Sequence, residues 1–289
     1  MTLRSRFPIR VAVLGGALLP APASADQLFS LCLAGAKAPA SGLAAWSLAP
    51  EVVVPLLGVA AAYGLAYARG GIDAEPRRAR LHAASFVLGY LLLLAALVSP
   101  LCRMAAATAS GHMVQHVILV ALAPPLLVLG LPARGATTSG SGRLPLATAL
   151  YGVLIWAWHL PTLYQAALVG VPAHLTMYVS LIMAGLWFWR EAIAAWGNPE
   201  RAGAAVLALL ATFVQTGLLG ALLTFSPRAW YPLMASGALS RGLMPMEDQQ
   251  LAGLIMWVPM GAVYLVAALV LAGRALARVP AFGPQRAQG

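Results

Sequence analysis

Charged residues are scarce in this sequence. Of its 289 residues, 18 are Lys or Arg and 8 are Asp or Glu, so 9% are charged, whereas a soluble domain usually has about 25%. Hydrophobic residues make up 61% of the chain and the mean hydropathy is +0.83. A water-soluble protein of this size needs more polar surface, and a disordered chain would be poor in apolar residues. The composition therefore argues against both classes and indicates an integral membrane protein with several helices.

Several functional signatures are also missing. The sequence has no Gly-rich phosphate loop followed by Lys and Ser or Thr, and no G-x-S-x-G nucleophile elbow. No acidic residue lies in the middle of an apolar run, and the only lysine, Lys37, lies outside these runs. Because pumps and ion-coupled transporters place ionisable groups inside the membrane, we expect neither of these functions. We also expect no enzymatic activity.

The first 25 residues have the pattern of a secretory signal peptide. Arg4, Arg6 and Arg10 precede a short apolar run from Val11 to Leu19, and an A-x-A site follows at residues 23–25. The apolar run is too short to span about 30 Å of hydrocarbon. We predict cleavage after Ala25, with an uncleaved anchor as the alternative. Residues 26–50, rich in Ala, Pro and Ser, then form an external lead-in.

Apolar runs of nearly membrane-spanning length fill residues 51–274. The backbone must satisfy its own hydrogen bonds in lipid, so we predict helices and an all-α fold. Pro124, Pro125 and Pro259 lie inside spans and are expected to kink them. The seven predicted spans are 52–68, 81–98, 112–131, 145–159, 174–189, 203–225 and 251–273.

The basic residues predict the orientation of this seven-helix bundle. With the N-terminus outside, 11 Lys or Arg residues fall on the inner side: in the inner loops, at Arg274 and in the C-terminal tail (residues 275–289). Another 4 fall in outer segments, and 3 fall in the signal peptide. Cytoplasmic loops of membrane proteins are enriched in Lys and Arg. The formal net charge of +10 therefore indicates topology, not nucleic-acid binding. We predict a multi-pass protein of the bacterial inner membrane with a cytoplasmic C-terminus.

Four of the five histidines fall at the outer ends of predicted spans. His112 and His116 are four residues apart, so they share one helical face. His159 ends the fourth span, and His174 begins the fifth. Imidazole suits copper, and thioether or thiolate ligands favour Cu(I). The softer candidates at the same depth are Met113, Cys102, Met104, Met244 and Met246, with Asp248 nearby.

Each of these residues also has a simpler interpretation. A histidine at a helix end is often only an interfacial polar group, and methionine in an apolar helix usually serves packing. Asp248 could be a solvated loop acid. Cys32 and Cys102 could form a disulfide in an oxidising compartment or remain unpaired.

The motifs around these residues resemble those of the bacterial cytochrome c oxidase assembly family of the CtaG type, which serves caa-type oxidases. The matching segments are His112-Met-Val-Gln-His116, the APPLLVLG segment at 123–130, WHLP at 158–161, and DQQLAGLIMWVP at 248–259. The resemblance covers about residues 46–271. It implies a multi-helix inner-membrane protein that helps to supply copper to a haem–copper terminal oxidase.

The family motifs carry over residue by residue. They imply metal-site roles for His112, His116 and His159, and place Asp248 and Gln249 in the DQ motif. A second histidine is expected four residues after His174, where this chain has Tyr178. The candidate metal ligands are therefore His112, His116, His159, Met113, Met244, Met246, Asp248 and His174.

Two other functions remain open at this point. The histidines could be axial ligands of haem in a haem-handling or redox protein. They could also be polar contacts between helices in a metal-free scaffold. The expected partners are a terminal oxidase subunit, periplasmic copper chaperones and membrane lipid, with no nucleic acid.

Overall fold

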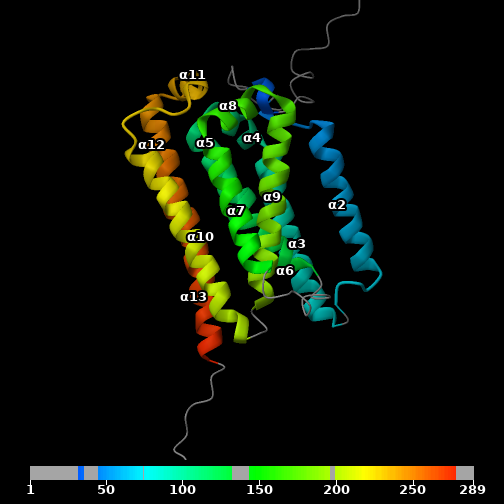
Figure 1. Ribbon diagram of the computed structural model, residues 1–289. Helices are drawn as coiled ribbons and strands as arrows, with labels where there is room; N and C mark the ends of the chain where they lie inside the picture. The colour runs from blue at the N-terminus through cyan, green and yellow to red at the C-terminus, as the bar shows by residue number, and fades with distance from the viewer. Residues whose placement is uncertain (1–31, 36–44, 74, 132–142, 196–198, 278–289) are drawn as a thin grey trace, which may run out of the picture.

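The computed structural model describes residues 32–35, 45–73, 75–131, 143–195 and 199–277. The predicted signal peptide and most of the predicted tail lie outside these residues. The described part is helical and contains no strand. Long helices run side by side as a bundle, and short helices gather at one of its ends (Figure 1).

Within the described residues, six helical stretches are long and apolar enough to cross a membrane. A seventh span is complete only if α7 (Arg143–His159) and α8 (Pro161–Val169), bent by 73° from each other, are taken together. The six stretches are α2 (Pro50–Ala68), α3 (Pro76–Leu97), Ala109–Gly130, α9 (Val171–Ala194), Arg201–Phe225 within α10 (Pro199–Phe225), and Pro245–Leu276.

Two of these stretches each consist of three consecutive helical segments. The first contains α5 (Ala109–Val117), η3 (Ile118–Leu122) and α6 (Ala123–Gly130). The second contains α12 (Pro245–Ile255), η7 (Met256–Met260) and α13 (Gly261–Leu276).

The predicted spans are correct in place but several boundaries are wrong. The third and seventh begin at Ala109 and Pro245, earlier than expected, because Thr108 caps α5 and Pro245 occupies the first turn of α12. Connections expected to be loops contain α4 (Pro100–Ala107), α8, η6 (Pro232–Met234) and α11 (Ala235–Leu239). Pro161 explains the break after His159, because proline favours the start of a new helix and disfavours the interior of one.

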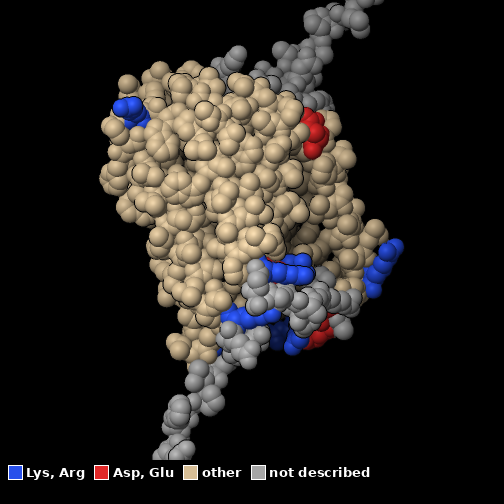
Figure 2. Space-filling view, viewed as in Figure 1, with Lys and Arg blue, Asp and Glu red and all other residues tan. Residues whose placement is uncertain are grey.

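The two ends of the bundle differ in charge. Figure 2 shows most of the visible Lys and Arg side chains around the lower end. We call this the arginine end; it includes Arg69, Arg77, Arg78, Arg80, Arg143, Arg190, Arg201 and Arg274. The opposite end carries α4, α8, α11 and the starts of α5, α9 and α12, and we call it the histidine end (Figure 1).

Two π-helical segments accompany prolines in the spans: η3 lies just before Pro124 and Pro125, and η7 contains Pro259. In an α-helix the carbonyl of Val120 would accept a hydrogen bond from residue 124, which is a proline and has no N–H. Here Val120 lies in the π-helical η3, and its carbonyl accepts hydrogen bonds from Tyr151 Oη at 2.8 Å and Trp189 Nε1 at 3.1 Å. Pro259 lies in the second π-helical segment, η7. The neighbouring helices α7 and α9 thus replace the hydrogen bond that Pro124 removes.

Helix α2 is attached to the rest of the bundle by few contacts. Only 17% of its most apolar window is buried. Tyr63 stacks on Phe86 of α3 with ring centroids 3.6 Å apart and donates a hydrogen bond to Gly130 O at 2.9 Å. Tyr90 of α3 donates to Leu56 O at 3.0 Å. These tyrosines fasten a helix that is otherwise largely exposed.

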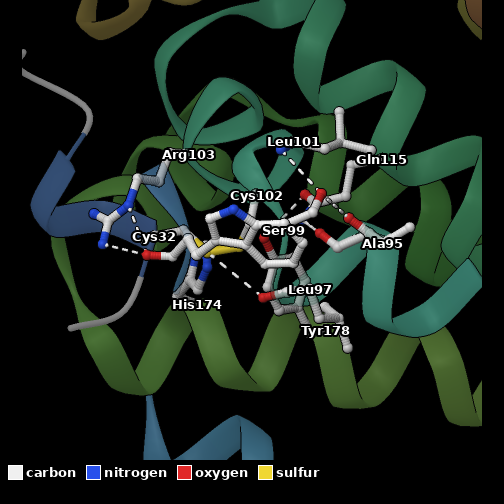
Figure 3. The surroundings of a disulfide bond; sticks show 12 residues. Cys32, Ala95, Leu97, Ser99, Leu101, Cys102, Arg103, Gln115, His174 and Tyr178 are labelled. Atoms are coloured by element: carbon white, nitrogen blue, oxygen red, sulfur yellow. Dashed lines mark hydrogen bonds between the residues drawn. A yellow bond between two sulfur atoms is a disulfide. The ribbon is translucent and has the colours of Figure 1, made fainter. Parts of the chain in front are cut away.

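A disulfide joins the lead-in to the histidine end. Cys32 in η1 (Cys32–Gly35) pairs with Cys102 in α4, with 5.5 Å between their Cα atoms (Figure 3). The next residue, Arg103, donates from Nε and Nη2 to Trp46 O at 3.3 and 3.0 Å. Of the two possibilities left open by the sequence, the structure has the paired one, and it fixes the lead-in against α4.

Candidate functional site

Three histidine rings meet at the histidine end of the bundle. His112 and His116 lie one turn apart on α5, and His159 is the last residue of α7. Their ring centroids are 5.9 Å apart for His112–His116, 6.4 Å for His112–His159 and 5.1 Å for His116–His159. All three side chains are buried. The i, i+4 spacing on one helix and the end of another thus build one imidazole cluster.

The unprotonated nitrogen of His159 can be assigned from its hydrogen bond. His159 Nδ1 lies 2.7 Å from Ile155 O. A carbonyl can only accept, so Nδ1 carries the proton and Nε2 of the neutral ring keeps its lone pair. Among the described residues, Nε2 of His116, His159 and His174 has no hydrogen-bond partner, although buried polar atoms normally have one. In His159, Nε2 therefore has the free lone pair that a metal ligand needs.

The spacing of the rings is compatible with one shared ion. Metal–imidazole bonds of about 2 Å place two ring centroids about 5 Å apart in tetrahedral geometry and about 6.4 Å apart in linear geometry. The three observed separations lie close to this interval. In the described part of the chain, however, no group of three or more His, Cys, Asp or Glu side chains is already arranged to hold a metal ion. Coordination by all three rings would require them to rotate.

His174 lies beside this cluster, at the start of α9. Its Nδ1 donates to Ala167 O at 3.2 Å, and it is close enough to His112 to interact electrostatically. Its ring packs edge-on against Tyr178 with centroids 4.4 Å apart (Figure 3). The Tyr178 hydroxyl donates to Gln115 Oε1 at 2.9 Å, and Gln115 Nε2 donates to Ala96 O at 2.7 Å. Tyr178 therefore links α9 to α5 where the family pattern has histidine.

Asp248 holds the N-terminus of the helix that carries two of the histidines. Its Oδ2 accepts from Ala109 N at 2.7 Å, and its Oδ1 accepts from Ser110 N at 3.1 Å and from the Ser110 hydroxyl. The first N–H groups of a helix have no partner within it, and a negative charge there is favourable. Asp248 is buried within α12 and is not a solvated loop acid.

Gln249 fixes the neighbouring loop. Its Oε1 accepts from Trp230 N at 2.6 Å, and its Nε2 donates to Leu223 O at 3.2 Å and Arg228 O at 3.0 Å. The two residues of the DQ motif thus face different neighbours: Asp248 binds α5 and Gln249 binds the chain after α10.

The three predicted methionine ligands lie outside the imidazole cluster, each in a different environment. Met113 is buried in the apolar core. Met244 precedes α12 with 58% of its surface exposed. Met246 is half-buried, two residues before Asp248 on the same helix, and residues two apart on a helix do not share a face.

Three residues that the sequence did not single out as ligands lie next to the cluster. The Tyr164 ring packs on His112 with centroids 4.5 Å apart, and Tyr231 packs on Tyr164 at 4.9 Å. The Tyr164 hydroxyl donates to Met234 Sδ at 3.8 Å. Burial raises the pKa of the Tyr231 phenol, which stays neutral and donates to His159 O at 2.9 Å. Because the partners lie 52 to 72 residues apart in the chain, no local spacing could have revealed them.

A comparison with known families extends over most of the chain. A family model described as cytochrome c oxidase caa3 assembly factor matches residues 61–278, which include every histidine of the cluster. Neither the curated proteins nor the solved structures include a match to the chain.

Proposed function

Because the chain belongs to the cytochrome c oxidase caa3 assembly factor family, we propose that it carries copper for a terminal oxidase and holds it at the histidine end of the bundle. Copper in this proposal is cargo. His112, His116 and His159 are its ligands, and His174 is the candidate for a fourth position. We place this end outside the bacterial inner membrane, where an oxidase subunit and copper chaperones would meet it.

One observation carries the proposal: three buried imidazoles from two helices lie 5.1 to 6.4 Å apart at their centroids. Burying imidazoles whose Nε2 atoms have no partner within the described residues costs free energy. If these nitrogens bind an ion, the metal–nitrogen bonds offset the free-energy cost of burying them. Since imidazole suits copper in either oxidation state, the cluster fits the cargo that an oxidase assembly factor would supply.

The residues around the cluster support transfer of a copper ion more than its permanent storage. Asp248 fixes the start of α5 and His159 is fixed through Ile155 O, so the rings are oriented without being preformed as a closed site. An ion held by two or three rings keeps an open coordination position. A ligand of the oxidase subunit could enter there before the cluster releases the ion.

Copper binding is testable on the purified full chain in detergent. We expect one tightly bound Cu(I) per chain in a competition titration against a chromogenic Cu(I) chelator. His112→Ala/His116→Ala should lower the affinity by about 100-fold or more, because two ligands are lost. His82→Ala, at the arginine end, is the matched control and should bind copper like the wild type. Equal binding by the double variant and the wild type would contradict the proposed site.

The cellular role needs a separate measurement. We expect a deletion strain to assemble terminal oxidase with less copper per enzyme. The wild-type gene and the His82→Ala gene should restore the copper content, whereas the double variant should not. Normal oxidase copper in the deletion strain would contradict copper delivery even if the purified protein binds the metal.

A further inference from the structure

A small cavity lies beside the imidazole cluster, between the start of α12 and the chain at 229–235. It has a volume of about 10 Å³, and its lining includes Tyr231, Met234, Ala235, Asp248 and Gln249. This is close to the smallest cavity that holds one water molecule. The space therefore suits a single bare ion and is too small for an ion still held by a chelating molecule.

Most polar atoms around the cavity are already used. The Tyr231 hydroxyl donates to His159 O, and Gln249 is bound to the loop on both its oxygen and its nitrogen. Met234 has a thioether that is buried, and Tyr164 Oη donates one hydrogen bond to it at 3.8 Å. A thioether sulfur has two lone pairs, so one remains for a ligand in the cavity.

Two tyrosines connect the residues of the cavity to the cluster. The Tyr164 hydroxyl contacts the sulfur of Met234, which lines the cavity, and the Tyr164 ring packs against the His112 ring. Tyr231, which also lines the cavity, packs on Tyr164 and donates to the carbonyl of His159. The Met234 sulfur is therefore the cavity atom that is joined, through Tyr164, to a histidine of the cluster.

The charge beside the cavity favours a cation. Asp248 lines it with a buried carboxylate and is near enough to Tyr164 to interact electrostatically. Both of its oxygens already accept hydrogen bonds from α5. It can therefore attract a positive ion without coordinating it, and the Met234 sulfur is left as the ligand.

We propose that Met234 is a transit ligand through which Cu(I) passes between the surface of the histidine end and His112. This inference rests on the proposed function. A thioether selects Cu(I) over harder divalent ions. In the transfer step a copper–thioether bond breaks as a copper–imidazole bond forms. Copper keeps its oxidation state, and no proton moves because both ligands are neutral.

The test measures how fast the purified full chain takes up Cu(I) from its bicinchoninate complex. Met234→Leu removes the sulfur at nearly constant volume, a change that cores usually tolerate. We expect uptake about tenfold slower, with less than a twofold change in equilibrium affinity, because the final ligands are intact. Met244→Leu removes an exposed thioether at the same end and should leave the rate unchanged. Zn(II) binding should be equally fast in all three proteins.

A second variant tests the passage and leaves the sulfur in place. Ala235→Leu narrows the cavity and leaves every ligand in place, so it should slow uptake as Met234→Leu does. This variant tests the passage even if Met234→Leu fails to fold.

These outcomes separate the transit role of Met234 from the proposed copper-carrying function on which it rests. A wild-type chain that takes up no Cu(I) would overturn both. Normal uptake by both Met234→Leu and Ala235→Leu would overturn the transit role of Met234 but not copper binding by the histidines. A loss of affinity in Met234→Leu as large as its loss of rate would make Met234 a resident ligand.

Discussion

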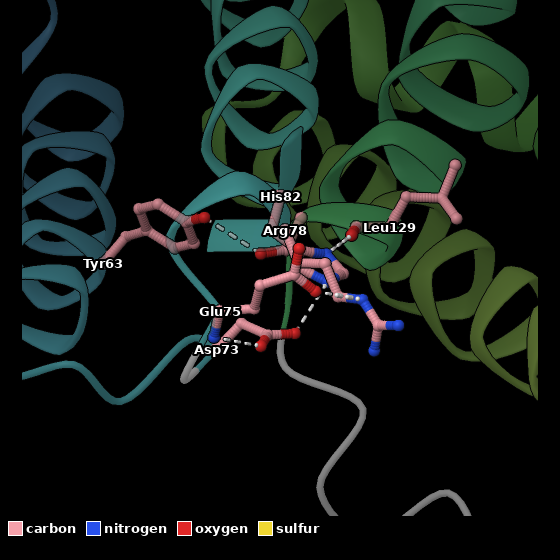
Figure 4. Close-up of polar contacts among 7 residues, drawn as sticks. Tyr63, Asp73, Glu75, Arg78, His82 and Leu129 are labelled. Carbon is pink, nitrogen blue, oxygen red and sulfur yellow. Dashed lines mark hydrogen bonds and ion pairs between the residues drawn. The ribbon is translucent and has the colours of Figure 1, made fainter. Parts of the chain in front are cut away.

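Both ends of the bundle contain histidine, but the nitrogens are used differently. At the arginine end, His82 Nδ1 donates to Leu129 O at 2.6 Å and Nε2 faces Asp73 Oδ2 at 3.7 Å (Figure 4). At the histidine end, Nε2 of His116, His159 and His174 has no partner among the described residues. The arginine end uses its imidazole to hold α3 against α6, whereas the histidine end has imidazole nitrogens that are available to bind a ligand.

The contrast shows that position at a helix end does not define a ligand. His82 lies near the start of α3 as His112 lies near the start of α5, and in the sequence only the predicted orientation of the spans distinguishes them. At the arginine end, His82, Ser85 and Tyr63 bind the last carbonyls of α6, those of Leu129, Leu126 and Gly130. The carbonyls of Leu129 and Gly130 would otherwise lack partners within the helix, which gives His82 a structural role.

The largest expected effect comes from removing a histidine with a free nitrogen. His159→Ala should weaken Cu(I) binding by about 100-fold, because it removes the ring nearest His116. Chelator competition on the purified protein measures this. An affinity within threefold of the wild type would remove His159 from the site and weaken the contrast between the two ends.

A smaller effect is expected from the residue that orients two of these rings. Asp248→Asn should weaken Cu(I) binding by about tenfold, as residues that orient ligands commonly do. It should also lower the free energy of unfolding by about 1–2 kcal/mol, because a charge at the helix N-terminus is lost. SDS titration monitored by circular dichroism measures the second quantity. Glu247→Gln, an exposed neighbour on α12, is the control. Glutamine can still accept the hydrogen bond from Met244 N, so copper affinity should not change and the loss of stability should be smaller than in Asp248→Asn.

The smallest effect is expected at the arginine end. His82→Ala should lower the free energy of unfolding by about 1 kcal/mol, because Leu129 O loses its hydrogen bond. Copper affinity should not change. The same two assays measure both quantities, and a copper defect in this variant would mean that the two ends do not differ as described.

Much of the fold follows from apolar length alone. The runs that became α2, α3, α9 and α10 are recognisable because lipid requires about 20 apolar residues per span. The short helices α4 and α8 were missed because they lie between spans and have no long apolar run. The π-helical turns were missed as well, because they depend on Tyr151 and Trp189 reaching Val120 O from other helices.

The candidate site was predictable only where its signal is local. The spacing of His112 and His116, together with the position of His159 at a span end, was enough to expect all three at one end of the bundle. The bond between Asp248 and α5 joins residues 138 and 139 positions apart, and the contact between Tyr164 and Met234 spans 70. Such contacts are set by helix packing, and one sequence carries no periodic signal for them.

The bond between Cys32 and Cys102 makes residues 32–102 a covalent ring. Helices α2 and α3 both lie within that ring. A protease that cut the connection between them, at Gly70–Gly71, would open the ring without releasing a fragment. Helix α2, the least buried of the candidate spans, would then stay tethered to α4 even with its backbone broken. After such a cut, its retention would depend on the disulfide together with the contacts of Tyr63 and Tyr90.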